Sequence, residues 1–125
     1  MSKIIKRIDS ENDTTVFTVF GKVAAKELVA AITDFYETSI TSNVLWDLTK
    51  SDLSEISLTD VEAIAGLSFK YSERRSSGKT AIVGHEDIAL GLSRMYEMTK
   101  EVSELPFETR AFRDIDEARN WLLSD

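Results

Sequence analysis

The segment that most constrains the fold runs from Asn43 to Leu67 and reads NVLWDLTKSDLSEISLTDVEAIAGL. It opens with an apolar run at residues 44–46, which ends at Asp47 and is followed by polar residues that include several hydroxyls. A helical pattern then begins near Ser57. A strand, a polar loop and a helix in this order build open α/β folds, which carry ligand sites at the carboxyl ends of their strands. The segment therefore predicts an α/β protein and marks residues 47–59 as its first candidate surface.

The rest of the chain repeats this alternation of short β-rich runs and helical patterns. Two β-branched runs joined by a short polar turn open the chain, which predicts an antiparallel hairpin. Strands and helices then alternate, so strands three to five should be parallel. The predicted strands cover 3–8, 14–20, 43–48, 79–84 and 107–112; the predicted helices cover 24–36, begin at 57–59 and near 87, and begin again after Asp114. The order β-β-α-β-α-β-α-β-α predicts a single domain, 1–125, with a mixed five-stranded sheet covered by about four helices.

Composition excludes several classes of function. The net charge of −7 argues against a nucleic-acid partner and against an anionic membrane surface. The absence of cysteine excludes disulfides, thiol catalysis and cysteine-ligated zinc. The start of the chain does not resemble a signal peptide, and no apolar run approaches the ~20 residues of a membrane span. We expect a bacterial, cytoplasmic protein with no transmembrane segment.

The third predicted helix carries a regular apolar seam that runs through to the residues before Pro106. Two residues, Tyr96 and Met98, lie off this seam, so they either form an exposed surface or pack against a neighbouring helix. The seam residues are spaced by four, three, four and three positions: Ile88, Leu92, Met95, Thr99 and Val102. A basic cluster at the end of the preceding helix is interpreted as a solvated helix end with favourable dipole contacts; it consists of Lys70, Arg74, Arg75 and Lys79.

Catalytic and metal motifs do not stand out. Ser57, His85 and Asp114 all fall at the predicted carboxyl edge of the sheet and have the order of a hydrolase triad, but no G-x-S-x-G elbow surrounds any serine. Acidic residues at helix starts more often serve as caps than as magnesium ligands; here they are Glu55, Asp60, Glu86 and Asp87. We therefore expect no enzyme activity, no metal and no cofactor.

With these residues laid out, the chain resembles the SpoIIAA-like (STAS/SEC14-type) family of small bacterial proteins. The resemblance covers most of the chain and rests on the order and spacing of several short pieces: residues 44–48 (VLWDL), 81–83 (AIV), 91–97 (GLSRMYE), 112–114 (FRD), 117–118 (EA) and 121–122 (WL). It implies an anti-anti-sigma-factor-like αβ sandwich, with helices covering the sheet.

The resemblance implies two kinds of function. Anti-anti-sigma factors are phosphorylated on a serine in a D-S-[ST]-G-like motif at the start of the helix after this strand. The corresponding stretch here, 54–60, lacks the motif; Ser57 is the nearest candidate and Thr59 the second. The SEC14-like half of the resemblance implies an apolar pocket between the helices and the sheet.

Two hypotheses follow from the residues and the resemblance together. The first is a non-enzymatic regulatory module that binds a protein partner, with Asp47, Thr49, Ser54, Ser57 and Thr59 as contact or phospho-switch candidates. The alternative is a module that binds a lipid or small apolar ligand, with Phe69, Tyr71, Tyr96 and Met98 as ligand contacts. A homodimer through the first strands is compatible with both hypotheses.

Overall fold

The computed structural model describes residues 2–75, 77–84 and 87–124. Five strands form one sheet: β1 (Lys3–Asp9), β2 (Thr14–Lys22), β3 (Asn43–Asp52), β4 (Lys79–Val83) and β5 (Glu108–Phe112). The helices are α1 (Ala25–Thr38), α2 (Leu58–Lys70), α3 (Asp87–Glu97), α4 (Lys100–Ser103) and α5 (Ile115–Leu123), with a 3-10 turn, η1 (Ser72–Arg74), after α2. The predicted mixed α/β fold is confirmed.

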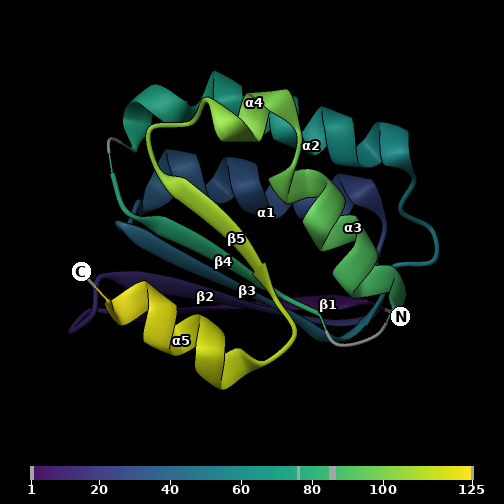
Figure 1. Ribbon diagram of the computed structural model, residues 1–125, viewed down its shortest axis with the longest axis horizontal. Coiled ribbons are helices and arrows are strands. Elements are labelled where there is room, and N and C mark those ends of the chain that lie inside the picture. The colour runs from purple at the N-terminus through teal and green to yellow at the C-terminus, as the bar shows by residue number, and fades with distance from the viewer. Residues whose placement is uncertain (1, 76, 85–86, 125) are drawn as a thin grey trace.

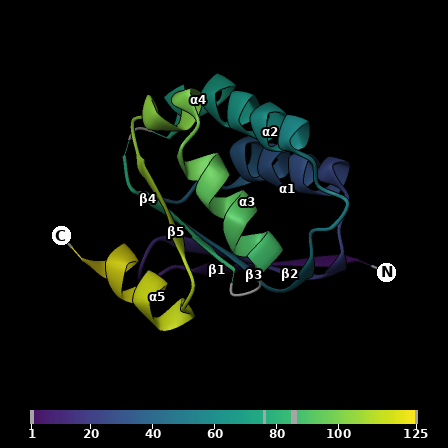
Figure 2. The same cartoon turned by 45° about the vertical axis from the view of Figure 1, so that its right-hand side comes forward.

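The strands lie in the sheet in the order in which they occur in the chain, β1-β2-β3-β4-β5. β1 is antiparallel to β2, and every later pair is parallel, so β2 joins the parallel strands as well. Because each crossover steps in the same direction with the usual right hand, the connecting helices all lie on one face. Figures 1 and 2 show α1–α4 on that face and α5 on the other. The strand order never reverses, so the sheet lacks the switch-point crevice on which the carboxyl-edge prediction rested.

The third strand is longer than its sequence predicted. Asp47 was expected to mark its end, but β3 continues to Asp52 and pairs there with β2, which also runs beyond its predicted end, to Lys22. The pairing shifts register between Thr18 and Phe20. Asp47 is buried, and its Oδ1 accepts hydrogen bonds from the amide and hydroxyl groups of Thr49, at 3.0 and 2.6 Å. The register shift interrupts the regular alternation of side chains along the strand. The polar residues after Asp47 therefore have the sequence pattern of a loop although they form a strand.

The third helix differs from its prediction because it breaks. α3 ends at Glu97, and Thr99 caps the short helix α4 by accepting a hydrogen bond from the amide of Val102. The inward stripe of α3 is consequently offset from the expected seam: Met95 and Met98 are exposed, whereas Tyr96 packs with the core. The side chain of Ile88 lies outside the described part of the chain. Leu92 packs against the core and Val102 is buried, as predicted.

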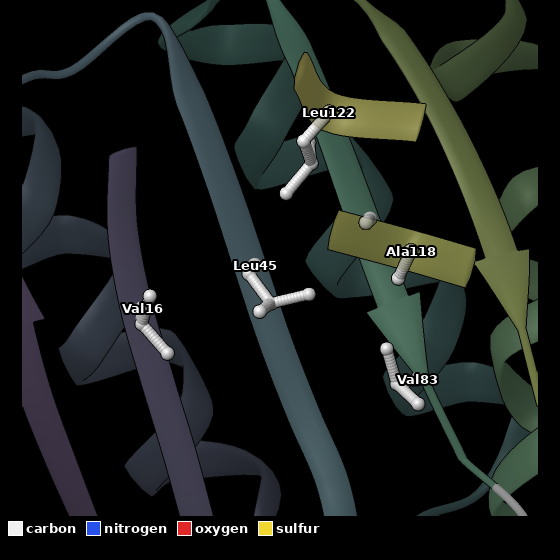
Figure 3. Packing of buried hydrophobic residues seen from close by; sticks show 6 residues of the cluster. Val16, Leu45, Val83, Ala118 and Leu122 are labelled. Atoms are coloured by element: carbon white, nitrogen blue, oxygen red, sulfur yellow. The ribbon is translucent and has the colours of Figure 1, made fainter. Parts of the chain in front are cut away.

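The two faces of the sheet carry different cores. Against α5, small and branched side chains pack in a single cluster, shown in Figure 3: Val16, Leu45, Ala81, Val83, Ala118 and Leu122. On the other face, aromatic rings dominate part of the core. The Phe17 ring stacks on Trp46 with centroids 4.2 Å apart and meets Phe35 edge-on. The core under α1–α3 therefore contains larger and more rigid side chains than the core under α5.

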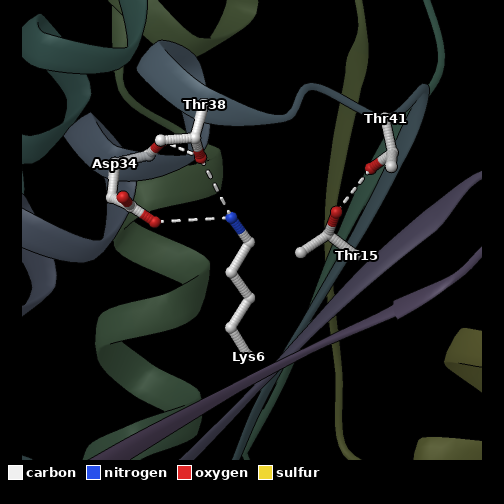
Figure 4. A network of polar contacts seen from close by, with 5 residues as sticks. All are labelled: Lys6, Thr15, Asp34, Thr38 and Thr41. Atoms are coloured by element: carbon white, nitrogen blue, oxygen red, sulfur yellow. Dashed lines mark hydrogen bonds and ion pairs between the residues drawn. The ribbon is translucent and has the colours of Figure 1, made fainter.

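Polar contacts fix α1 and the segment after it against the hairpin (Figure 4). Lys6 Nζ lies 3.4 Å from a carboxylate oxygen of Asp34 and 3.4 Å from the hydroxyl of Thr38. The hydroxyls of Thr15 and Thr41 share a buried hydrogen bond of 2.8 Å. These contacts hold one wall of the helix-covered face in place.

Candidate functional site

The hydroxyl-rich carboxyl edge serves mainly to build local structure. Ser57 is the N-cap of α2: its Oγ accepts a hydrogen bond from the amide of Asp60 at 3.1 Å, and its own amide donates to Asp60 Oδ2 at 2.9 Å. This capping box resolves the N-cap that the sequence left open. Thr49 is bonded to the buried Asp47, and the side chains of Ser54 and Thr59 are exposed.

Two members of the candidate triad serve as helix caps in the described residues. Ser57 caps α2, and Asp114 caps α5 by accepting a hydrogen bond from the amide of Asp116. His85 and Glu86 lie outside the described residues. Within 2–75, 77–84 and 87–124, no three histidine or acidic side chains gather as metal ligands would.

A cavity of about 120 Å³ lies between the sheet and helices α1, α2 and α3. Strands β2, β3 and β4 form its floor, and none of its lining residues comes from α5. Its wall is mostly aliphatic and aromatic: Phe17, Leu28, Ile32, Phe35, Val44, Trp46, Leu48, Leu53, Ile56, Val61, Ile64, Ile82, Leu92 and Phe107. Protein cores contain few voids larger than a water molecule, so a space of this size is a specific feature of this face.

Of the four residues predicted to contact an apolar ligand, Tyr96 lines this cavity. Phe69 is exposed, and Met98 is 81% exposed. Tyr71 stacks on the ring of Tyr36 with centroids 5.3 Å apart, behind the cavity wall. Sequence reasoning missed most of the lining because these side chains look like ordinary core residues, and no local pattern distinguishes a wall from a filled core.

Polar groups occur in the cavity wall beside the apolar ones. The hydroxyl oxygens of Tyr96 and Ser68 lie 2.7 Å apart, and Ser68 Oγ also donates to the carbonyl of Ile64 at 3.1 Å. Ser93 Oγ likewise donates to the carbonyl of Ala89. Burial raises the pKa of Tyr96 to about 12, and the hydrogen bond with Ser68 offsets this only partly. Tyr96 is therefore a neutral hydrogen-bonding group at physiological pH.

A buried cation also lines the cavity: the side chain of Arg75, which is only 4% exposed. Nε and Nη2 both donate to the carbonyl of Ser42, at 3.1 and 2.8 Å, and Nη2 also donates to the carbonyl of Lys79 at 2.7 Å. Nη1 donates to Thr80 Oγ1 at 2.6 Å, and the guanidinium carbon lies 3.9 Å from the ring centroid of Phe107. The interpretation of Arg75 as part of a solvated basic cluster is therefore wrong.

Tertiary structure explains the burial of Arg75. Gly78 adopts a positive φ of 106°, and a Cβ at this position would lie 1.8 Å from the carbonyl oxygen of Ser42. Only glycine lets the two backbones approach in this way, and the approach presents the Ser42 carbonyl to the guanidinium. Nothing in the sequence separates Arg75 from its exposed neighbour Arg74, because the burial of Arg75 depends on the approach of Ser42, which lies 33 positions away.

Comparison with known proteins identifies the fold. No family model matches the chain, and no curated protein matches it. The chain is similar to a solved structure, an uncharacterised protein of the DUF3478 family with a SpoIIAA-like fold from Shewanella loihica PV-4. The two share 20% sequence identity with a TM-score of 0.58, over 97% of this chain and 93% of the other. The fold is therefore SpoIIAA-like, as the resemblance implied.

Among the described residues, no helix has the length and apolar character needed to span a membrane. The longest of these helices, α1, has 14 residues, whereas a transmembrane helix needs about 20 apolar residues.

Proposed function

We propose that this chain is a non-enzymatic binding module that takes a small, largely apolar molecule into the cavity beneath α3. One observation carries the proposal: a space of about 120 Å³, lined mainly by apolar side chains, lies in the core between the sheet and the helices. Side chains that border an unfilled space lack contacts on that side. A ligand that fills it recovers lost contacts, which is the driving force for binding.

The volume limits the size of the ligand. Apolar protein cavities of about 150 Å³ stay dry and bind benzene or xenon. A space of about 120 Å³ therefore suits a ring or a short branched chain of roughly six non-hydrogen atoms. A long acyl chain requires the helices to move apart, so we favour a small molecule over an intact lipid.

Binding of benzene tests the proposal without knowledge of the natural ligand. Benzene should raise Tm and shift the NMR signals of methyl groups in the wall, such as those of Leu53, Val61 and Ile82. Val61→Phe, which places a ring in the space, should abolish the shift. Leu123→Phe adds a ring at an exposed site on α5 and should leave binding intact. If saturating benzene changes neither Tm nor the methyl signals, the proposal is ruled out.

A second candidate function is contact with a protein partner at the start of α2. The observation that favours it is an exposed apolar residue, Leu58, which lies between Ser57 and the exposed hydroxyl of Thr59. Phosphorylation of Thr59 would add about two negative charges in the first turn and alter docking. Thr59→Asp should change the set of proteins captured from a bacterial lysate. Thr59→Asn has the shape of the aspartate variant without its charge and serves as the control, so it should leave the captured set unchanged.

A further inference from the structure

The buried guanidinium of Arg75 lacks an acidic partner in the described part of the chain. Within those residues the ion pair at salt-bridge distance joins Lys6 to Asp34, and neither residue lines the cavity. Burying an unpaired charge is costly, and proteins usually pair such charges. Here two backbone carbonyls, one hydroxyl and one aromatic ring surround the cation, all of them neutral groups. This end of the cavity therefore keeps a net positive charge.

Two hydroxyls at this end of the cavity each have a hydrogen that they can donate to a ligand. Thr80 Oγ1 accepts from Arg75, so its own hydrogen is directed elsewhere, and Thr80 lines the cavity. Tyr36 also lines the cavity, and its phenol interacts with the Arg75 side chain. Its hydroxyl likewise has a hydrogen to donate. The group that completes this arrangement must accept hydrogen bonds.

The two phenols do not neutralise the cation. Burial raises the pKa of Tyr36 and that of Tyr96, with the charge of Arg75 offsetting the shift only in part. Both side chains therefore stay protonated at neutral pH. The charge of Arg75 remains available for an anion that enters the cavity.

We infer that the ligand is a small monocarboxylate, whose carboxylate lies against Arg75, Tyr36 and Thr80 and whose apolar body fills the space beneath α3. The inference rests on the proposed function, since it uses the same cavity. One buried cation matches one negative charge. Four of the five guanidinium hydrogens already bind Ser42, Lys79 and Thr80, so the carboxylate oxygens would accept from the remaining Nη1 hydrogen and from the two hydroxyls. The rest of the wall is apolar, so the body of the ligand should carry no second charge.

A matched set of probes tests the inference by isothermal titration calorimetry at pH 7. Benzene reports the cavity alone, benzyl alcohol adds a neutral polar group, and benzoate adds the carboxylate. Benzoate should bind at least tenfold more tightly than benzyl alcohol. If benzene binds but benzoate binds no better than benzyl alcohol, this inference is overturned and the proposed function stands. If none of the three binds, both fail.

Substitutions locate the carboxylate. Tyr36→Phe removes one donor and keeps the ring, so it should weaken benzoate several-fold and leave benzene unchanged. Arg75→Lys keeps the charge but loses the planar group that binds Ser42 and Thr80 and places the remaining donor, so it should reduce the preference for benzoate over benzyl alcohol. Arg74→Met removes the adjacent cation, which does not line the cavity, and should change neither affinity. An equal loss of benzoate affinity in Arg74→Met and Arg75→Lys would overturn the assignment to Arg75.

Chain length separates a small acid from an acid derived from lipid. Hexanoate should bind in the same range as benzoate, because its body is of similar size. Dodecanoate should bind no more tightly than hexanoate, since about 120 Å³ cannot take the additional carbons. Tighter binding of dodecanoate would overturn the size limit.

Discussion

The two faces of the sheet are formed by the same strands but differ in how their side chains pack against the helices. On β2 and β3, Val16 and Leu45 point to α5, whereas their neighbours Phe17 and Trp46 point to α1–α3. Small side chains pack against a single helix in the first case. Large rings and three helices meet in the second, and they leave a space of about 120 Å³. One face of the sheet is therefore filled by small side chains, whereas the core on the other face keeps a space.

The face with the cavity carries several polar groups in its core. Arg75, Ser68 and Tyr96 all line the cavity. Polar groups in a core cost stability unless their hydrogen bonds are satisfied, so they are expected where they serve a ligand or fix a geometry.

The sharpest way to break the comparison is a matched pair of leucine truncations. Leu122 on the α5 face and Leu53 in the cavity wall are both 5% exposed. Leu122→Ala should cost about 4 kcal/mol and Leu53→Ala about 2 kcal/mol, because part of the Leu53 surface already faces empty space and loses fewer contacts. Urea unfolding measures both free energies. Equal losses would mean that the faces are equally well packed.

Removal of the buried cation should have the next largest effect. Arg75→Met strands the carbonyls of Ser42 and Lys79 without their donors and should cost about 3 kcal/mol. Arg74→Met removes an exposed arginine of the same charge and should cost less than about 1 kcal/mol. Chemical denaturation of the two variants side by side gives the difference. A small loss for Arg75→Met would indicate that the polar end of the cavity contributes little to the fold.

Alkaline pH should produce a smaller loss that belongs to the cavity face alone. The unfolded chain releases the Tyr96 proton near pH 10, whereas the folded protein holds it until about pH 12. Stability from this group is therefore complete below pH 10 and declines as pH rises toward 12, by up to about 2 kcal/mol. Tyr36, whose pKa burial also raises, adds to the slope.

Unfolding titrations between about pH 9 and pH 11.5 measure this slope. Tyr96→Phe should reduce it, and Tyr71→Phe, which removes a hydroxyl outside the cavity, should leave it unchanged. A slope that survives Tyr96→Phe intact would place the alkaline transition elsewhere in the molecule.

Much of the fold could be predicted because local patterns carry it. The alternation in β2, the caps at Ser57 and Asp114, and the order of strands and helices all follow from neighbouring residues. The extension of β3 could not be predicted, because it depends on pairing with residues 20–22 of β2. The offset stripe of α3 follows from the cap at Thr99, which competes with a continuous helix.

The candidate site was harder to predict, for a different physical reason. Arg75 is buried because Ser42 and Lys79, from two other segments, bring their carbonyls to it. A cavity is defined by atoms that are missing between side chains, and a sequence pattern cannot encode a gap among residues such as Leu53 and Ile82. The SEC14-like half of the resemblance did point to a space between helices and sheet, and Tyr96 was the one named residue found in its wall.

The sequential strand order has a consequence for how the molecule assembles. Each strand pairs with the strand before it in the chain, so contacts form between successive units and the sheet can grow from β1 to β5 during synthesis. The cavity wall draws on residues from Phe17 to Phe107, so it closes only when almost the whole chain is present. The last helix, α5, then seals the opposite side, and a chain that stops before it would carry a complete binding wall on a sheet whose other side is still bare.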